Sequence, residues 1–297
     1  LSVSGLRGKG LVSLLLAPIM MLKACYQASN IIRRRQPDVI LGLGGFASGP
    51  GGLMAWLHKT PLVIHEQNRV PGTTNRLLKK LAKRVLEAFP NSFDEQTGAI
   101  FTGNPVRKEL LGGSVGEPKK NTNILVVGGS LGASVLNEVV PEALQSLQAS
   151  LSVNVIHQAG KATIQIAREK YSEAGVAADI REFIADMKQV YQWADIVICR
   201  AGAMTISELA IMGLPSILVP LPHAIDDHQT KNAAYLADAE AAVLMPQSTL
   251  TSQNLSETLK ALLTNENQLS DMRKKARSLA KPEATELVAN ACLEVAL

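Results

Sequence analysis

The sequence has few cysteines, few aromatic residues and no long apolar run, and each scarcity excludes a class of protein. Its 297 residues include three cysteines, Cys25, Cys199 and Cys292. Their spacing fits neither a zinc motif nor a disulfide framework, which indicates a reducing compartment. Aromatic residues make up 4% of the chain and are not interleaved with its basic residues. Because no nucleic-acid motif is recognisable either, we expect no nucleic-acid partner.

The start of the chain lacks the features of a membrane span or a signal peptide. The longest apolar run, residues 11–22, is too short to cross a bilayer and contains Pro18. Residue 1 is Leu, and no charged segment with a small-residue cleavage site follows it. We therefore expect the chain to begin inside a domain.

Charge is distributed unevenly along the chain. Residues 1–110 contain 15 Lys and Arg against 6 Asp and Glu, a net charge of +9. Residues 111–297 contain 15 against 20, a net charge of −5. The first part should therefore be attracted to an anionic partner, and an acidic membrane surface is favoured over DNA.

Short apolar runs alternate with amphipathic helical patterns, a rhythm typical of βαβ units and parallel sheets. The length suits two domains, and 46% hydrophobic residues can fill two cores. The second part has enough strand-like runs for a complete doubly wound sheet. These runs are residues 123–129, 153–158, 179–184, 195–202, 215–222 and 241–246.

The first part has fewer strand-like runs, at residues 38–43, 61–67, 85–89 and 99–103, with LSVSGL at 1–6 as a possible edge remnant. It is about two strands short of the second part, so we expect the first domain to be incomplete and to lack an N-terminal βα region. A stretch rich in Gly, Pro and polar residues predicts a linker. The expected division is a first domain over 1–112, a linker over 113–122, a second domain over 123–281 and a C-terminal helix over 282–297 that packs back on the first domain.

Two strand–turn–helix junctions are rich in glycine, GLGGFASGPGG at 42–52 and GGSLGA at 128–133. Glycine lets a backbone turn sharply and bring its N–H groups close to an anion. Close packing of a strand against a helix explains such glycines equally well. Neither segment is a Walker A loop, and no acidic residue ends the strand after GGSLGA, so neither matches the dinucleotide fingerprint.

Polar residues stand between core segments in RAGAMTISE at 200–208. One interpretation is a capped helix, with Thr205 or Ser207 near its N-terminus and Glu208 in the first turn. The other is a ligand site at the end of a strand, in which Glu208 supplies a carboxylate for a ribose.

Two further clusters could carry chemistry. His65 and Glu66, in HEQN at 65–68, could act as acid or base or could cap the next segment. A second cluster, around LPHAIDDHQTKNA, does not have the spacing of a standard metal site, so a solvated loop with polar caps is favoured. Its members are His223, Asp226, Asp227 and His228.

Taken together and in order, these motifs closely resemble the MurG family of peptidoglycan glycosyltransferases. The motifs are GLGGFASGPGG, HEQN, GNPVR at 103–107, GGSLGA, FIADM at 183–187, RAGAMTISE and HQTKNA. The resemblance implies a GT-B fold, two Rossmann-like domains facing a cleft. It also implies inverting transfer of N-acetylglucosamine from UDP-N-acetylglucosamine to lipid I, undecaprenyl-pyrophosphoryl-N-acetylmuramyl-pentapeptide, giving lipid II. No metal or other cofactor is expected.

The resemblance also implies roles for particular residues. Ile184 would present its backbone to the uracil, Glu208 would accept the ribose hydroxyls, and Ser130 and Thr205 would lie near the phosphates. Asn68 and Gln229 would contact the sugar, and Arg107 and Arg200 would be charge partners. The full expected donor set is Asn68, Arg107, Ser130, Ile184, Ala203, Met204, Thr205, Ile206, Ser207, Glu208 and Gln229. The acceptor pyrophosphate would lie on Gly44, Gly45, Ser48 and Gly49.

The family docks on the cytoplasmic face of the bacterial inner membrane through an apolar patch ringed by basic residues. The candidates here are Leu11, Leu14, Leu15 and Trp56, with Arg7, Lys9, Lys79, Lys80 and Lys83. A core-facing stripe is the alternative interpretation for the leucines.

One family motif is absent. A GGTGGH-like loop, whose His is the usual candidate base, does not occur in the sequence. We therefore assign no catalytic base, with His65 and Glu66 as weak candidates. Two alternatives stay open, a catalytically impaired UDP-sugar-binding fragment and another GT-B glycolipid glycosyltransferase.

Overall fold

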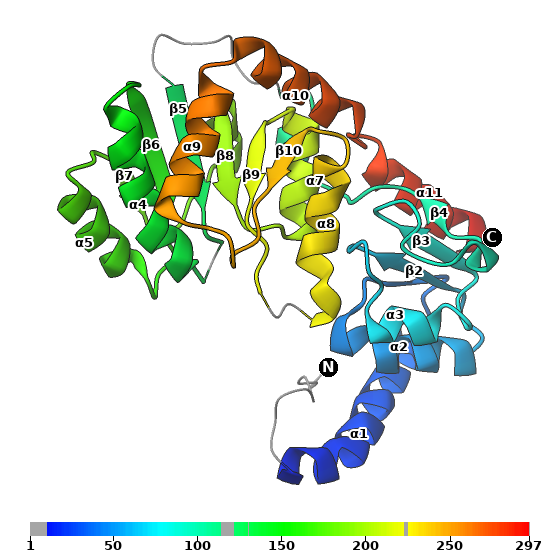
Figure 1. Ribbon diagram of the computed structural model, residues 1–297. Helices are drawn as coiled ribbons and strands as arrows, with labels where there is room; N and C mark the ends of the chain where they lie inside the picture. Colours follow the sequence, from blue (N-terminus) through cyan, green and yellow to red (C-terminus); the bar gives the residue numbers. More distant parts are fainter. Residues whose placement is uncertain (1–10, 114–121, 130, 223–224, 297) are drawn as a thin grey trace. The chain divides into compact units, whose positions relative to one another are not determined.

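A computed structural model describes residues 11–113, 122–129, 131–222 and 225–296 (Figure 1). They form two compact units. The first runs up to Pro105 and also takes in the chain from Glu283 onward, and the second is Val106–Pro282. The boundary therefore falls inside the GNPVR motif, with Arg107 in the second unit. The segment 114–121 of the expected linker lies outside the described residues, as does LSVSGL.

The first unit contains a four-stranded parallel sheet in the order β1-β2-β3-β4. Its strands are β1 (Ile40–Gly42), β2 (Leu62–Glu66), β3 (Arg84–Glu87) and β4 (Ile100–Phe101). Its helices are α1 (Leu11–Arg35), α2 (Gly45–Leu57), α3 (Thr73–Leu78) and α11 (Ala284–Ala296), and the short 3₁₀ turn η1 spans Glu95–Thr97.

Alternating residues of β2 and β3 fill two separate cores, one on each face of this sheet. Leu62, Ile64 and Val85 pack with side chains from α2 and α3. On the opposite face Val63 and Leu86 pack with Val288 and Ala291 of α11. The C-terminal helix thus completes the first unit, and helices cover both faces of its sheet (Figure 1).

The second unit contains a six-stranded parallel sheet in the order β10-β9-β8-β5-β6-β7. Its strands are β5 (Thr122–Val127), β6 (Val153–Gln158), β7 (Asp179–Arg181), β8 (Ile196–Cys199), β9 (Ser216–Leu218) and β10 (Ala242–Leu244). Its helices are α4 (Ser134–Gln148), α5 (Ile164–Ala174), α6 (Met187–Trp193), α7 (Ala203–Met212), α8 (His228–Ala237), α9 (Ser252–Leu263) and α10 (Glu266–Ser278), with 3₁₀ turns η2 (Lys108–Leu110) and η3 (Ile225–Asp227).

The strand order reverses between β5 and β8, which lie side by side at the centre of the second sheet. In a doubly wound sheet such a reversal leaves a crevice beyond the carboxyl ends of the two strands, where ligands bind. The turns that follow β5 and β8 are GGSLGA and the start of RAGAMTISE. The fold thus brings together two motifs that are about 70 residues apart in the sequence.

All ten predicted strands are confirmed, although most are shorter than predicted. The prediction for 215–222 is the largest overestimate, because β9 covers only Ser216–Leu218. The prediction for 179–184 is also too long, because β7 ends at Arg181 and Phe183 is exposed. Within the described ranges, no helix is both long and apolar enough to cross a membrane.

Candidate functional site

The turn after β5 is held in a tight glycine conformation. Gly129 and Gly132 have φ angles of 85° and 80°, which L-residues with side chains rarely adopt. At Gly132 an added Cβ would overlap Thr163 Oγ1 and Ala159 O, so the turns after β5 and β6 pack directly on each other. Close packing is therefore established for Gly132, whereas Gly129 has open space around it. Ser130 lies outside the described residues.

Helix α7 begins differently from the capped-helix interpretation. Gly202 is the N-cap residue, and no side chain caps this end of the helix. Ser207 Oγ donates to Ala203 O at 3.1 Å, a bond within the helix. Thr205 lies in the first turn as that interpretation expects, but Glu208 lies in the second turn, so its expected first-turn position is wrong. The α7 N-terminus thus lies at the crevice, and within the described ranges no side chain caps its N–H groups.

Glu208 is a buried carboxylate with two differently occupied oxygens. The Tyr191 hydroxyl on α6 donates to Oε2 at 3.0 Å. Oε1 faces Arg107, whose Nε is 3.9 Å away and whose side chain is 55% exposed. Burial raises the pKa of Glu208, while the Tyr191 hydrogen bond and the Arg107 charge act in the opposite direction. Among the described residues no donor lies within hydrogen-bond distance of Oε1.

Arg200, an expected charge partner, and Gln229, expected to contact the donor sugar, both form hydrogen bonds within the protein. The Arg200 guanidinium donates to Val219 O, Pro220 O and Gln247 Oε1. Arg200 therefore ties together the chain after β9 and the chain after β10. The Gln229 side-chain oxygen accepts from Leu221 N at 2.9 Å, which fixes the side chain at the start of α8.

The remaining expected donor residues differ in exposure. Ile184 is buried, and its N–H donates to Gln158 Oε1 at 3.3 Å. Met204 is 39% exposed at the first turn of α7, next to buried Ala203. Ile206 is fully buried and its N–H donates to Gly202 O, so its side chain belongs to the core. Only backbone groups of Ile184 and Ile206 could therefore serve a ligand.

In the first unit, His65 and Glu66 are structural in this geometry. His65 is fully buried, its Nε2 donates to Gly103 O at 3.0 Å, and Nδ1 lies 3.3 Å from Gln67 Nε2. Burial lowers the pKa of His65. Since both ring nitrogens are engaged within the protein, the imidazole is not positioned to take a proton from a substrate.

Glu66 organises the loop that follows β2. Its Oε1 accepts from Asn68 N and Asn68 Nδ2, and its Oε2 accepts from Gly72 N and Asn75 Nδ2. Four donors use the lone-pair positions of a carboxylate. Glu66 therefore holds the loop between β2 and α3 in place. Of the two roles predicted for HEQN, the geometry supports capping of the next segment rather than acid or base chemistry.

The glycine-rich segment at 42–52 is a strand–turn–helix junction, as predicted, but most of it is helix. Only residues 43–44 form the turn, and Gly44 is the N-cap of α2 with φ 77°. Gly45, Ser48 and Gly49 lie within the first turns of α2, and Ser48 Oγ donates to Gly44 O at 2.6 Å. The expected pyrophosphate residues thus gather at the amino end of α2, beyond β1.

Asp226 and Asp227 lie on the surface of the turn before α8 and do not join a third potential metal ligand among the described residues. Both aspartates have positive φ and are exposed, and Asp227 Oδ1 accepts from Thr230 Oγ1. No group of three potential ligands occurs in the part of the chain that the structure describes. His223 lies outside that part.

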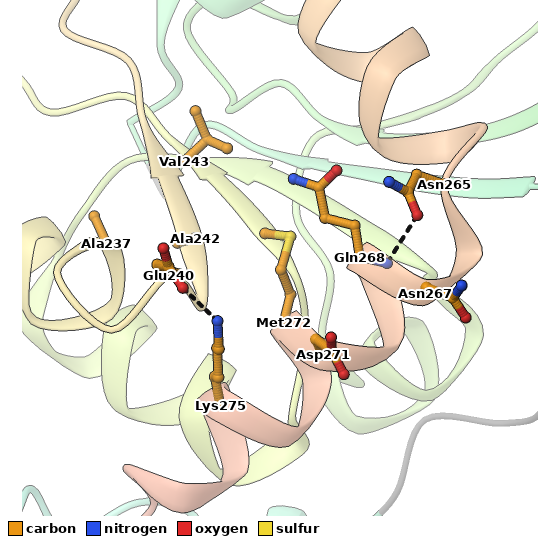
Figure 2. A pocket seen from close by; sticks show the side chains of 10 residues that line it. All are labelled: Ala237, Glu240, Ala242, Val243, Asn265, Asn267, Gln268, Asp271, Met272 and Lys275. Atoms are coloured by element: carbon orange, nitrogen blue, oxygen red, sulfur yellow. Dashed lines mark hydrogen bonds and ion pairs between the residues drawn. The ribbon is translucent and has the colours of Figure 1, made fainter.

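A cavity of about 500 Å³ lies away from this crevice, between edge strand β10 and helix α10 (Figure 2). Its charged side chains, Glu240, Asp271 and Lys275, already pair within the protein. Lys275 bonds to Glu240, and Asn265 caps α10 by accepting from Gln268 N (Figure 2). None of the residues expected to bind either substrate lines it.

Sequence reasoning missed Tyr191 and Asn75, which contact the two central carboxylates. Tyr191 looks like an ordinary apolar-face residue of a short helix, and its partner is 17 residues further along the chain. Asn75 lies inside a short helix and resembles a surface amide. Neither residue lies within the motif that contains its carboxylate, so the sequence offered no signal for either contact.

The two units, each built on a parallel α/β sheet, have the architecture of the GT-B fold, and comparison with known proteins places the chain among glycosyltransferases. The sequence matches the glycosyltransferase family 28 N-terminal domain over residues 1–87 and the glycosyltransferase family 28 C-terminal domain over residues 123–288. The chain belongs to glycosyltransferase family 28.

Individual relatives are similar to this protein over 99–100% of the chain. A UDP-N-acetylglucosamine–N-acetylmuramyl-(pentapeptide) pyrophosphoryl-undecaprenol N-acetylglucosamine transferase from Methylococcus capsulatus is 54% identical over 297 residues, 100% of this chain and 84% of the relative. A Pseudomonas putida protein of the same name is 54% identical over 298 residues, 100% of this chain and 83% of the relative. The crystal structure of Acinetobacter baumannii MurG is 38% identical with a TM-score of 0.82, over 99% of this chain and 84% of that one.

Proposed function

We propose that this protein transfers N-acetylglucosamine from UDP-N-acetylglucosamine to lipid I, giving lipid II and UDP. The observation that carries the proposal is the 54% identity, over the entire chain, to enzymes named for this transfer. The geometry at α7 supports the donor half of the reaction, because a buried carboxylate and an uncapped helix start meet at the crevice of the second sheet.

In this proposal the second unit binds UDP. Glu208 Oε1 accepts a ribose hydroxyl, the backbone of Ile184 meets the uracil, and the N–H groups at the start of α7 face the diphosphate. Arg107 balances the charge beside Glu208. Ser130, Ala203, Met204, Thr205, Ile206, Ser207 and Gln229 complete the proposed set, and contact of Asn68 with the donor sugar stays a prediction.

The first unit takes the acceptor in this proposal. Its pyrophosphate lies at the start of α2, on Gly44, Gly45, Ser48 and Gly49, where helix N–H groups favour negative charge. An acceptor hydroxyl attacks the anomeric carbon, its proton passes to a general base, and the bond to the UDP oxygen breaks with inversion. No residue is assigned as that base, and no metal or cofactor is proposed.

We also propose that the protein docks peripherally on the anionic cytoplasmic face of the inner membrane. Exposed apolar residues of α2 and α3, including Trp56, Leu57 and Leu77, support this location, as does the charge of +9 over residues 1–110. Lys79, Lys80 and Lys83 follow α3 directly. Leu11, Leu14 and Leu15 belong to the same proposal, and Arg7 and Lys9 lie outside the described residues.

A transfer assay tests the proposed reaction. The protein is incubated with UDP-N-acetylglucosamine labelled in the sugar and with a lipid I analogue, and label is counted in the lipid product. We expect labelled product that depends on lipid I and is lost in Glu208→Ala. Binding of the donor without any transfer to the lipid I analogue would overturn the proposed reaction and leave the two alternatives, a UDP-sugar-binding fragment or a GT-B glycosyltransferase with another glycolipid acceptor.

A further inference from the structure

Tyr191 lies directly behind Glu208. Its hydroxyl donates to Glu208 Oε2 at 3.0 Å, and its ring is 1% exposed. Cys199, at the carboxyl end of β8, is also fully buried beside this pair, and the Glu208 charge contributes to the raised pKa of its thiol. The Tyr191 hydroxyl and the Cys199 thiol beside the carboxylate are therefore both shielded from solvent.

The two oxygens of the Glu208 carboxylate therefore have different partners. Oε2 is taken by the protein, and Oε1 points toward the exposed Arg107 side chain. A carboxylate on a flexible side chain would otherwise rotate between several orientations at an entropic cost on binding. A hydrogen bond from a buried ring restricts that freedom. Tyr191 itself cannot reach a ligand, since it is covered.

We propose that Tyr191 is a positioning residue that fixes Glu208 with Oε1 facing a ribose hydroxyl, and that it thereby sets the preference of the site for ribonucleotides over 2′-deoxyribonucleotides. The inference rests on the proposed function, because it requires a UDP donor at α7. It goes further in naming the group that orients the ribose-binding carboxylate. A hydrogen bond to a charged acceptor from a buried, rigid donor has the strength that such a role needs.

Calorimetric titration of the full chain with UDP and with 2′-deoxy-UDP tests the inference. In Tyr191→Phe we expect UDP binding to weaken about tenfold and 2′-deoxy-UDP binding about twofold, so the preference for UDP falls. In the transfer assay the variant should raise KM for the donor more than it lowers kcat, because the loss is in binding.

Tyr171→Phe is the matched control. Tyr171, on α5, is also buried, and its hydroxyl lies 3.0 Å from Nδ1 of His157 on β6. Its loss should leave the affinity for UDP within about twofold, and melting temperatures show whether both variants fold. The wild type supplies a test that needs no variant, since it must itself bind UDP more tightly than 2′-deoxy-UDP.

The outcomes separate the two proposals. An unchanged preference for UDP in a folded Tyr191→Phe, or equal weakening toward both nucleotides, overturns the role of Tyr191 and leaves the donor site standing. Equal affinity of the wild type for UDP and 2′-deoxy-UDP also overturns the role of Tyr191 and leaves the donor site standing. A folded wild type that binds neither UDP nor UDP-N-acetylglucosamine overturns the proposed function, and the role of Tyr191 with it.

Discussion

Asn75 Nδ2 lies 2.8 Å from Glu66 Oε2, and the same amide group packs against the Cα of Gly44, where an added Cβ would be 3.2 Å from it. One buried side chain therefore links the loop after β2 to the start of α2. Asn75 Nδ2 also donates to His65 O, while Asn75 Oδ1 is buried without a partner among the described residues. The two regions assigned to substrates in the first unit thus share a support.

Asn75→Ala should destabilise the protein by about 1–3 kcal/mol, because it leaves the buried Glu66 carboxylate short of a donor. Asn75→Asp should cost more, since it sets a second carboxylate beside Glu66. Urea unfolding followed by circular dichroism gives the free energy of unfolding. Asn267→Ala, at an exposed amide of α10, is the control and should change it by less than about 0.5 kcal/mol. Equal stability of Asn75→Ala and this control would contradict the linking role.

The turn after β5 offers a matched pair of glycines. Gly129→Ala should lower the free energy of unfolding by about 1 kcal/mol, because a side chain is strained at positive φ. Gly132→Ala should cost about 1–3 kcal/mol more, because its Cβ would overlap Thr163 Oγ1 and the backbone of Ala159. Thermal or urea unfolding of the two variants compares them directly. Equal losses would mean that the turns after β5 and β6 are not in tight contact.

Much of the fold could be predicted from the sequence because parallel strands buried on both faces are continuous apolar runs. VNVIHQ, for example, is predicted and found over the same six residues. The start of α2 could not be predicted, because its glycines and Pro50 have poor helix propensity and tertiary packing overrides it. Arg200 illustrates the same limit for sites, since only the folded chain brings Val219 O and Pro220 O to its guanidinium.

His157 should make stability depend on pH. Burial lowers its pKa from 6.5 to about 3 in the folded state, so between these values the unfolded chain binds the proton and the folded chain does not. The contribution of neutral His157 to the free energy of unfolding is therefore fully present above pH 6.5. It falls as the pH drops toward 3, by up to about 1.4 kcal/mol per pH unit. The free energy of unfolding, measured from pH 5 to pH 7, should have a smaller slope in His157→Asn. Identical slopes would show that folding does not lower the pKa of His157.

The membrane proposal can be tested at Trp56, which is 52% exposed on α2. Trp56→Asp should weaken binding to phosphatidylglycerol vesicles about tenfold or more, because an apolar contact is replaced by a charge that the surface repels. Co-sedimentation with vesicles measures this. Leu293→Asp, at an exposed leucine of α11, is the control for adding the same charge elsewhere on the first unit. If both variants bind as the wild type does, α2 is not part of the docking surface.

The central claim is that UDP-N-acetylglucosamine binds at α7 through Glu208, and calorimetric titration of the wild type and Glu208→Gln with this donor tests it most directly. Gln keeps an oxygen that can accept from Tyr191 and removes the charge, so the variant should fold with an unchanged melting temperature. We predict saturable binding to the wild type and an affinity at least about tenfold lower in Glu208→Gln. A folded wild type that gives no heat of binding, or a variant that binds as tightly as the wild type, would contradict the assignment.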